Sequence, residues 1–216
     1  MYSASHDLRA PLSSISGLIQ LIERTRDPGE TEQYLNLMKG RIEGLEQFIR
    51  DIINFSRNAR SEIKTEQVNI RELVDETFEA LKFMKGAEAI VLQNELPNPL
   101  MIVIDRTRLQ IVLFNIISNA IQYKDFNKTI SFIHFNSESA ERQVIIHIDD
   151  NGIGIDNSHH PKMFNMFYRA SENAKESGLG LYIVKETMDK LGGTISLQSV
   201  LGEGTRLTLK LPIETN

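Results

Sequence analysis

The segment VIIHIDDNGIGID places a carboxylate where an apolar row would otherwise continue. Side chains alternate between the two faces of a strand, so Asp150 shares a face with three apolar residues, Val144, Ile146 and Ile148. Asp149 points to the opposite face. A carboxylate at the end of a buried row costs free energy unless it is hydrogen-bonded, and an amino group such as that of adenine would satisfy it. Gly152 and Gly154 would let a flat ring approach the backbone. The sequence Asp-Asn-Gly is also typical of an ordinary turn, and taken alone it favours that interpretation.

A second segment, RLQIVLFNIISNAIQY, carries two amides on one side of an expected helix. Asn115 and Asn119 are four residues apart, which is about one helical turn, so they project from one face. The other face is apolar and comprises Leu109, Val112, Leu113, Ile116 and Ile117. Amide oxygens can hold Mg²⁺ together with phosphate oxygens, because hard cations prefer oxygen ligands. The spacing alone is equally compatible with two surface polar residues.

The segment SGLGLYIVKE begins a third expected helix, near 179–191. Gly178, Leu179 and Gly180 lie at its start, where free backbone N–H groups and the helix dipole can receive phosphate. A flexible turn before a helix would look the same, and an isolated Gly-x-Gly is weak support. Gly202 and Gly204, in LGEGTRLTL, are expected in a hairpin loop.

The N-terminal region has the periodicity of two helices. Apolar residues recur at alternating spacings of three and four, first at Leu8, Leu12, Ile15, Ile19 and Ile22 and then at Leu35, Met38, Ile42, Leu45, Ile49 and Ile52. The sequence DPGE between them predicts a short turn, so the two helices should form an antiparallel hairpin. A single hairpin cannot cover its own apolar stripe. Pairing with a second copy into a four-helix bundle is the favoured remedy, and packing on the downstream domain is the alternative.

Beyond the hairpin the pattern changes. The polar stretch SRNARSEIKTEQ, residues 56–67, predicts a linker or hinge. We therefore expect a hairpin domain at 1–58, a linker at 59–67 and a second domain at 68–216. The second domain should contain helices at 70–85, 106–123 and 179–191. Its strands are expected at 89–96, 100–105, 129–135, 143–150, 193–200 and 204–212, with the polar 136–143 as a loop. Helices on one face of a mixed, largely antiparallel sheet predict an α+β sandwich.

Composition narrows the possible functions. The chain has 216 residues, a net charge of −5 and no cysteine. The charge gives no reason to expect a nucleic-acid partner, and the lack of cysteine excludes disulfides and thiolate sites. No segment approaches the roughly 18 apolar residues of a membrane span, and no signal peptide is expected. The helical pattern begins so early that we expect the chain to come from a longer protein.

Taken together and in order, five segments resemble the bacterial sensor histidine kinases of two-component signalling. They are the opening SHDLRAPL, the asparagine pair, DNGIG, GLG and GEGT. The segment MFNMFYRA, with Phe164, Phe167 and Arg169, fits the same family. The resemblance spans essentially the whole chain. It implies a dimerisation and phosphoacceptor hairpin followed by the α+β ATP-binding domain shared with gyrase and MutL.

The resemblance also implies roles for individual residues. His6 would be the phosphoacceptor, and Asp7 would hydrogen-bond its second ring nitrogen. Pro11 cannot donate a hydrogen bond to the Asp7 carbonyl, so a loosened turn is expected beside the ring. The remaining roles concern the cofactors ATP and Mg²⁺. Asn119 would bind the metal, Asn115 would assist it or contact the phosphates, and the phosphates would also meet Gly178, Leu179 and Gly180. Asp150 would bind the adenine amino group, with Gly152 and Gly154 beside the ring, and Tyr123 matches the aromatic residue after the asparagine pair.

Three positions depart from the family pattern. Ala10 stands where Thr or Asn often positions water for dephosphorylating the response regulator, so weak phosphatase activity is expected. Gln122 replaces a basic residue, and Lys124 is a candidate substitute at a doubtful helical offset. Glu176 replaces the first glycine of the usual phosphate loop.

The leading prediction is a protein-histidine kinase that forms a homodimer, receives signals from an upstream sensor domain and phosphorylates a response regulator receiver domain. Two alternatives are a nucleotide-sensing dimerisation module and an ATPase without a phosphohistidine. This fragment is expected in the cytoplasm, and the sequence leaves open whether the intact protein is anchored to a membrane.

Overall fold

The computed structural model describes residues 3–60, 62–140, 142–170 and 178–213, with side chains from Leu12 onward except those of residues 43, 47, 48 and 50–60. Within it the chain divides into two compact units. One comprises Met1–Ala59 and Met166–Leu179, and the other comprises Arg60–Asn165 and Gly180–Asn216.

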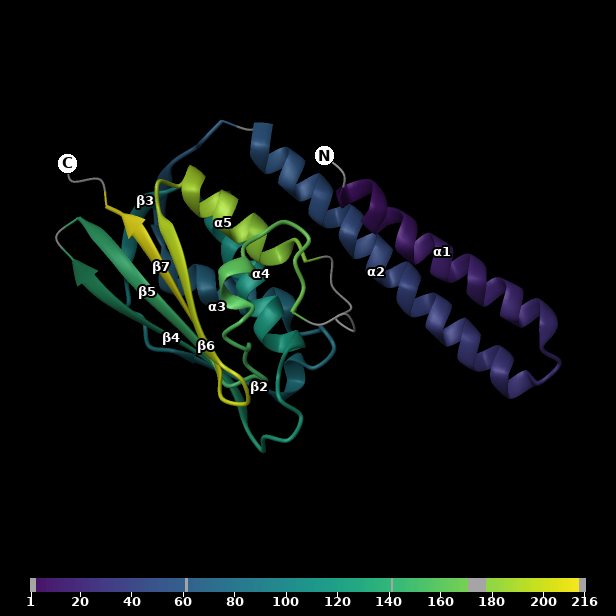
Figure 1. Cartoon of the computed structure of the whole chain (residues 1–216). Coiled ribbons are helices and arrows are strands. Elements are labelled where there is room, and N and C mark those ends of the chain that lie inside the picture. Colours follow the sequence, from purple (N-terminus) through teal and green to yellow (C-terminus); the bar gives the residue numbers. More distant parts are fainter. Residues whose placement is uncertain (1–2, 61, 141, 171–177, 214–216) are drawn as a thin grey trace. The chain divides into compact units, whose positions relative to one another are not determined.

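The first unit contains a helical hairpin, in which α1 (Ser3–Arg24) and α2 (Pro28–Arg60) lie side by side (Figure 1). The prediction that DPGE, residues 27–30, forms the turn is only partly right, because the turn comprises residues 25–27. Pro28 begins α2, because its fixed φ and missing N–H suit the first helical position. The Asp27 carboxylate caps the helix by accepting the N–H of Gly29 at 2.8 Å.

The hairpin covers its predicted apolar stripe only in part. Ile15, Ile22, Met38 and Leu45 are half-buried, and the side chains of Leu8 and Ile52 lie outside the described residues. Among the side chains that the structure describes in α1 and α2, none is buried. Leu12, Ile19, Leu35 and Ile42 are between 42 and 52% exposed. An exposed apolar surface of this kind favours a partner surface that covers it.

The expected linker at 59–67 is more structured than its composition suggests. Helix α2 continues to Arg60, and a short strand, β1 (Glu66–Asn69), begins at its far end. This strand was missed because only Val68 of its four residues is buried. It pairs antiparallel with β3 (Met101–Ile104).

The second unit is built on a five-stranded sheet in the order β2-β4-β5-β7-β6. Its strands are β2 (Ile90–Asn94), β4 (Ser131–Ala140), β5 (Gln143–Asp150), β6 (Thr194–Val200) and β7 (Gly204–Pro212). The β2–β4 pair is parallel and the other three pairs are antiparallel, so the sheet is mixed as predicted. The polar residues 136–140 extend β4 instead of forming a loop, because their partners in β5 continue the ladder.

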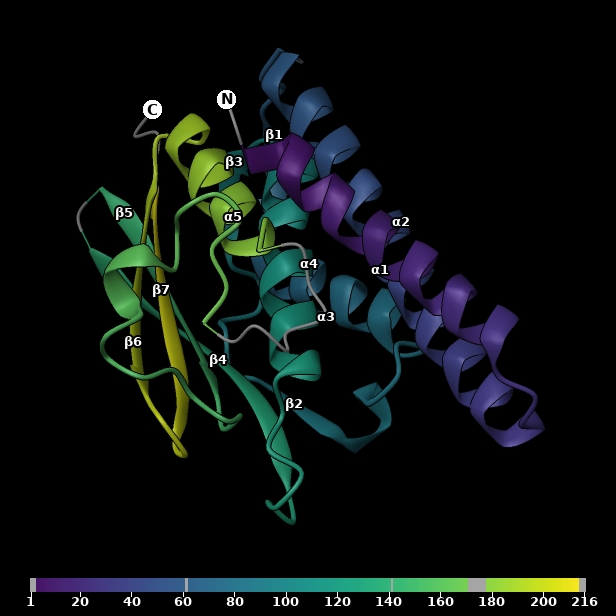
Figure 2. The same ribbon diagram turned by 45° about the vertical axis from the view of Figure 1, so that its right-hand side comes forward.

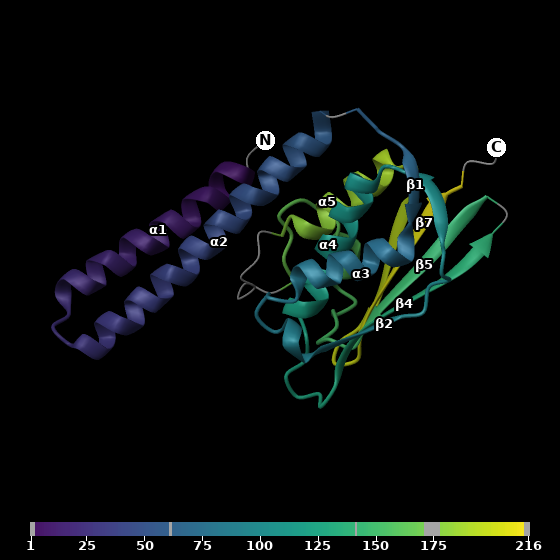
Figure 3. The ribbon, with the colours of Figure 1, turned by 180° about the vertical axis from the view of Figure 1, so that it is seen from behind.

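Three helices cover one face of this sheet, as Figures 1 and 2 show from two sides. They are α3 (Ile70–Leu81), α4 (Arg106–Gln122) and α5 (Gly180–Lys190), and short 3₁₀ turns lie at Ala87–Ala89 and His160–Lys162. The predicted α+β sandwich is therefore confirmed. Seen from behind, β1 and β3 form a separate pair of strands beside the main sheet (Figure 3).

Asp105 fixes the start of α4 and the end of the linker together. One carboxylate oxygen accepts the N–H of Arg108 at 3.0 Å, and the other accepts the N–H of Lys64 at 3.0 Å and pairs with the Arg108 guanidinium. Burial opposes the charge of Asp105, but these hydrogen bonds and Arg108 outweigh it and lower the pKa of the carboxyl. The segment before β1 is thus anchored at Lys64.

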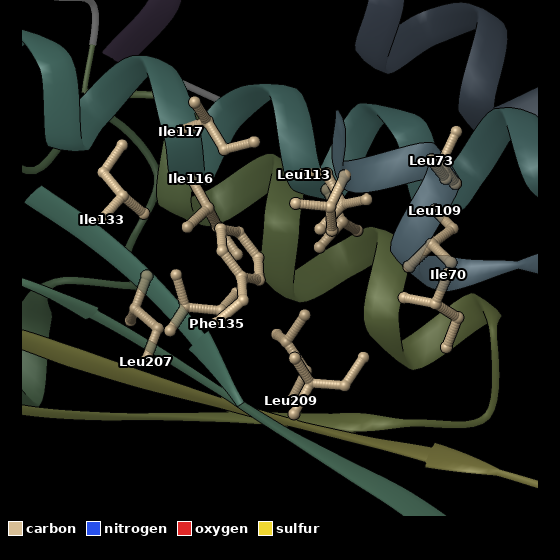
Figure 4. Packing of buried hydrophobic residues seen from close by; sticks show 14 of the residues in the cluster. Ile70, Leu73, Leu109, Leu113, Ile116, Ile117, Ile133, Phe135, Leu207 and Leu209 are labelled. Carbon is tan, nitrogen blue, oxygen red and sulfur yellow. The ribbon is translucent and has the colours of Figure 1, made fainter. Parts of the chain in front are cut away.

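The hydrophobic core lies between the helices and the sheet. Figure 4 shows Phe135 of β4 among side chains of α4 and β7, including Ile116 and Leu209. All three side chains are at most 2% exposed. The aromatic ring at the centre of the sheet therefore joins the two layers.

Phe135→Ala tests this core. Removing a fully buried ring should lower the free energy of unfolding by about 3 to 5 kcal/mol, since the site cannot collapse completely. Phe126, which is 83% exposed, gives the matched control, and Phe126→Ala should change it by less than about 0.5 kcal/mol. Urea unfolding of the two variants provides the measurement, and equal losses would contradict the assignment of the core.

Candidate functional site

Asp150 lies at the end of β5, on the helix-covered side of the sheet. Val144, Ile146 and Ile148 on the same face are buried, as the strand pattern predicts. The pKa of the Asp150 carboxyl is raised to about 6, mainly by burial and to a smaller extent by the neighbouring charge of Asp149. Backbone N–H groups of Gly152 and Thr205 and the charge of Lys128 act in the opposite direction. The carboxylate is therefore only partly stabilised by the protein itself, and a further hydrogen-bond donor would stabilise it more.

The glycines after Asp150 allow protein backbone to come close. A Cβ on Gly152 would lie 2.5 Å from the carbonyl oxygen of Tyr123, and a Cβ on Gly154 would lie 2.0 Å from that of Val200. Gly154 also has φ +67°, which favours glycine. Sequence reasoning assigned these glycines to a ligand ring. In the structure, the space beside them is occupied by two other segments of the chain.

Hydrogen bonds hold these contacts in place. The N–H of Ile153 donates to the Tyr123 carbonyl at 2.9 Å, and the N–H of Gly202 donates to the Ile153 carbonyl at 2.7 Å. The Ser199 hydroxyl accepts the N–H of Ile155 at 2.8 Å and donates to the Gly204 carbonyl at 2.7 Å. The loop after β5 is therefore fixed between the end of α4 and the β6–β7 turn.

Two positioning residues were missed by sequence reasoning. The Lys128 ammonium donates to the carbonyls of Asn151 and Glu203, both at 2.8 Å, and to that of Gly152 at 3.3 Å. The Asn151 side chain donates to the Ile130 carbonyl at 2.8 Å and accepts the N–H of Phe132 at 2.9 Å. Nothing in a single lysine within a polar loop marks such a role, whereas Asn151 stood within the quoted Asp-Asn-Gly motif.

The asparagine pair meets the start of α5. A Cβ on Gly180 would lie 3.4 Å from Oδ1 of Asn115 and 3.5 Å from Oδ1 of Asn119, so these three residues come together as expected. The side-chain NH₂ group of Asn115 donates to the Ile111 carbonyl at 2.8 Å. Its Oδ1 is the acceptor atom of the same amide and takes no part in that hydrogen bond. Two amide oxygens beside a helix N-terminus suit Mg²⁺ bound together with phosphate.

Among the described residues there is no group of three or more His, Cys, Asp or Glu side chains that could hold a metal ion. Asn119 is the residue that the family resemblance implies as the Mg²⁺ ligand.

Tyr123 and Lys124 lie at the end of α4. The N–H of Tyr123 donates to the Asn119 carbonyl at 2.9 Å, and the Tyr123 carbonyl holds the loop after Asp150. Two backbone hydrogen bonds thus connect Asn119 to that loop. The Lys124 ammonium donates to the Gly86 carbonyl at 3.1 Å, in the turn before β2. In this structure it therefore does not take the place of the basic residue that is missing at position 122.

The other predicted site residues belong to the first unit. Gly178 has φ +69°, and its Cβ would lie 2.8 Å from the backbone of Phe167, whose N–H donates to the Gly178 carbonyl at 3.1 Å. Leu179 is buried. The backbones of His6 and Asp7 lie in α1, which is assigned as continuous through Pro11, while their side chains fall outside the described part of the chain. Glu176 also lies outside it.

Two protein-family models match the chain. The His Kinase A (phospho-acceptor) domain matches residues 1–61. The family described as histidine kinase-, DNA gyrase B- and HSP90-like ATPase matches residues 104–215. The chain belongs to this ATPase family. ATP binding is accordingly a property of its second unit, where the asparagine pair and Asp150 lie.

Named relatives agree with the family. The autoinducer 2 sensor kinase/phosphatase LuxQ of Vibrio vulnificus is 31% identical over 221 residues, covering 97% of this chain and 26% of LuxQ. The signal transduction histidine-protein kinase AtoS of Escherichia coli is 33% identical over 215 residues, covering 99% of this chain and 34% of AtoS. The chain spans about a quarter to a third of the length of these curated relatives.

Solved structures show the same fold. The Acinetobacter baumannii histidine kinase AdeS has a TM-score of 0.71 at 24% identity, over 97% of this chain and 98% of AdeS. The histidine kinase ThkA, solved in complex with the response regulator protein TrrA, has a TM-score of 0.74 at 24% identity, over 97% of this chain and 59% of that one. No described helix of the present chain is long and apolar enough to cross a membrane.

Gly154→Ala tests the close backbone contact at the site. Its Cβ would collide with the Val200 carbonyl, so the loop after Asp150 must move and ATP-analogue binding should weaken at least tenfold. Gly202, with φ +82° and nothing within 4 Å of a Cβ, is the matched control. Gly202→Ala should cost only the backbone strain of about 1 kcal/mol and leave binding nearly intact. Calorimetric titration and thermal unfolding give both quantities, and equal effects on binding would contradict the role of the contact.

The pKa of Asp150 predicts a pH-dependent stability in the nucleotide-free protein. The carboxyl has an ordinary pKa of 3.8 and a folded-state pKa of about 6, so the folded chain binds more protons between these values. Its stabilising contribution is complete below pH 4 and is lost as pH rises through 6, a change of about 3 kcal/mol. Asp150→Asn does not titrate. Relative to the wild type, its free energy of unfolding should therefore increase by roughly 2 to 2.5 kcal/mol from pH 4 to pH 7. A pH-independent difference in urea unfolding would refute this.

Proposed function

We propose that this chain is the catalytic core of an ATP-dependent protein-histidine kinase of two-component signalling. The observation that carries the proposal is the convergence of Asn115, Asn119 and Gly180 in a unit of the ATPase family that follows a phosphoacceptor domain. Residues 1–58 would supply the phosphoacceptor, 59–67 the linker and 68–216 the ATP site.

In the proposed reaction, His6 is the nucleophile. An unprotonated imidazole nitrogen attacks the γ-phosphorus of ATP, the bond to the β,γ-bridging oxygen breaks and ADP leaves. Asp7 hydrogen-bonds the N–H of the other ring nitrogen and holds the ring in the reactive tautomer. The phosphoryl group then passes from the imidazole to a carboxylate oxygen of an aspartate in a receiver domain.

The ATP site would act mainly by alignment and charge neutralisation. Asn119, assisted by Asn115, would hold Mg²⁺, which neutralises phosphate charge when bound. Gly178, Leu179 and Gly180 would offer backbone N–H groups to the phosphates, and Asp150 would accept a hydrogen bond from the adenine amino group. Gly152, Gly154 and Tyr123 would shape the wall beside the base.

The proposed partners follow from the hairpin and from the reaction. The exposed apolar stripe of α1 and α2 would be buried in a homodimer, giving a four-helix bundle. A response regulator receiver domain would be the phosphoryl acceptor, and an upstream sensor domain would control the reaction. A reaction that consumes ATP and modifies a response regulator would take place in the cytoplasm.

Incubation with γ-labelled ATP tests the proposal. A kinase should acquire label that is labile in acid and stable in alkali, and His6→Ala should abolish it because the nucleophile is removed. His147, which lies on β5 in the second unit, supplies the control, and His147→Gln should still be labelled. Nucleotide binding without label would instead indicate the sensing module, and released phosphate indifferent to His6 would indicate the ATPase.

A further inference from the structure

The face of the sheet opposite the helices carries a row of charged groups beside Asp150. The β4–β5 register places His134 opposite Asp149, and the β5–β7 register places Arg206 opposite Asp149. These three residues lie side by side on three neighbouring strands. Asp149 is the residue directly before Asp150, so the row begins one peptide unit from the candidate adenine-binding carboxylate.

Asp149 and Arg206 form a two-point ion pair. Nε of Arg206 donates to Oδ1 of Asp149 at 2.5 Å, and Nη2 donates to Oδ2 at 3.0 Å. This geometry is the preferred one for guanidinium and carboxylate groups. Because the Asp149 side chain is 20% exposed, solvent screens its charge only in part.

On its other side, Asp149 faces a histidine that also lies close to a second carboxylate. Nδ1 of His134 lies 3.8 Å from Oδ2 of Asp149, and Nε2 of His134 lies 3.0 Å from a carboxylate oxygen of Glu95. Other charged or titratable groups near the row, among the described residues, are Glu138, which acts on Arg206 and lies 3.6 Å from Nε2 of His147, and Lys128, which acts on Asp150. Arg206 is therefore the permanent cation of this row, whereas His134 is cationic only when protonated.

The charge of Asp149 acts electrostatically on Asp150, although the two side chains lie on opposite faces of the sheet. The two side chains point to opposite faces, so they share no hydrogen bond, yet the charge of Asp149 acts to keep Asp150 protonated. An adjacent cation would cancel that effect. An ionised Asp150 is what an adenine amino group requires, since only a free acceptor oxygen can receive its N–H.

We propose that the Asp149–Arg206 ion pair is a charge balance for Asp150: Arg206 offsets part of the charge of Asp149, so that Asp150 is more readily ionised and competent to bind the base. Arg206 and Asp149 are in this sense positioning residues that act across the sheet without touching the nucleotide. The inference rests on the proposed function, which assigns the adenine amino group to Asp150.

A double-mutant cycle distinguishes charge balance from a structural role. Arg206→Gln leaves Asp149 unbalanced and should raise the pKa of Asp150, by roughly half a unit to one unit. Asp149→Asn leaves Arg206 unbalanced and should lower it. The double variant is neutral again, and its Asp150 pKa should return to the wild-type value. If the pair served only to hold β5 and β7 together, the double variant would show no such return.

The first measurement is the titration of the Asp150 carboxyl carbon by NMR in the nucleotide-free protein. The pKa of Asp150 should be highest in Arg206→Gln and lowest in Asp149→Asn. In the wild type and the double variant it should be equal and lie between these two values. Lys210→Gln is the matched control, because Lys210 lies on the same face of β7 but opposite Ile145, about 13 Å further along the strand. Equal shifts in Lys210→Gln and Arg206→Gln, or no shift in Arg206→Gln, would overturn the proposal.

The second measurement is the affinity for an ATP analogue at pH 6 and pH 8. Arg206→Gln should bind about two to five times more weakly than wild type at pH 6 and equally well at pH 8, as the ionised fraction of Asp150 requires. A pH-independent loss would overturn the charge balance. The adenine role of Asp150 and the charge balance by Arg206 fail in different ways. Intact binding in Asp150→Asn would refute the adenine role and leave the NMR titrations valid. A reversed order of the titrations would refute the charge balance alone.

Discussion

The candidate site depends on a close approach between three segments of backbone. The loop after β5 lies against the end of α4 at Gly152 and against the β6–β7 turn at Gly154, where any side chain would collide with a carbonyl group. Gly204 completes the arrangement, since its Cβ would lie 2.0 Å from the carbonyl of Asp150. Backbone contacts of this kind vary little with side-chain motion. They therefore hold Asp150 in place more firmly than side-chain packing would.

The same contacts explain how two distant parts of the sequence form one site. Asn119 is joined to the loop after Asp150 through Tyr123, whose N–H and carbonyl each make one of the two connecting hydrogen bonds. Lys128 adds a second connection by binding three carbonyl groups, from Asn151, Gly152 and Glu203. A displacement of α4 would thus be transmitted to the loop. The amide of Asn119, proposed to bind the metal, and the carboxylate of Asp150, proposed to bind the base, are thus positioned by one framework.

Much of this could be predicted because the sequence encodes it through periodicity. The alternation before Asp150 gave its face, and the four-residue spacing of Asn115 and Asn119 gave theirs. Periodicity does not predict an element or a contact whose formation depends on a partner that is distant in the sequence. Strand β1 exists because β3 pairs with it, residues 136–140 extend β4 because β5 continues opposite them, and Lys128 acts on carbonyls up to 75 residues away. The glycines were identified, but their neighbours, Tyr123 and Val200, could not be read from local sequence.

Strand geometry also separates the tasks of two adjacent carboxylates. Asp149 and Asp150 are consecutive in the chain, but alternation places one among charged groups on the outer face and the other beneath the helices. On the outer face an arginine can neutralise the carboxylate with two hydrogen bonds. On the inner face burial leaves the carboxylate in need of a donor, and a ligand can supply it. Charge on one side of a sheet can therefore be used to adjust affinity on the other, at a distance where no side chain contacts the ligand.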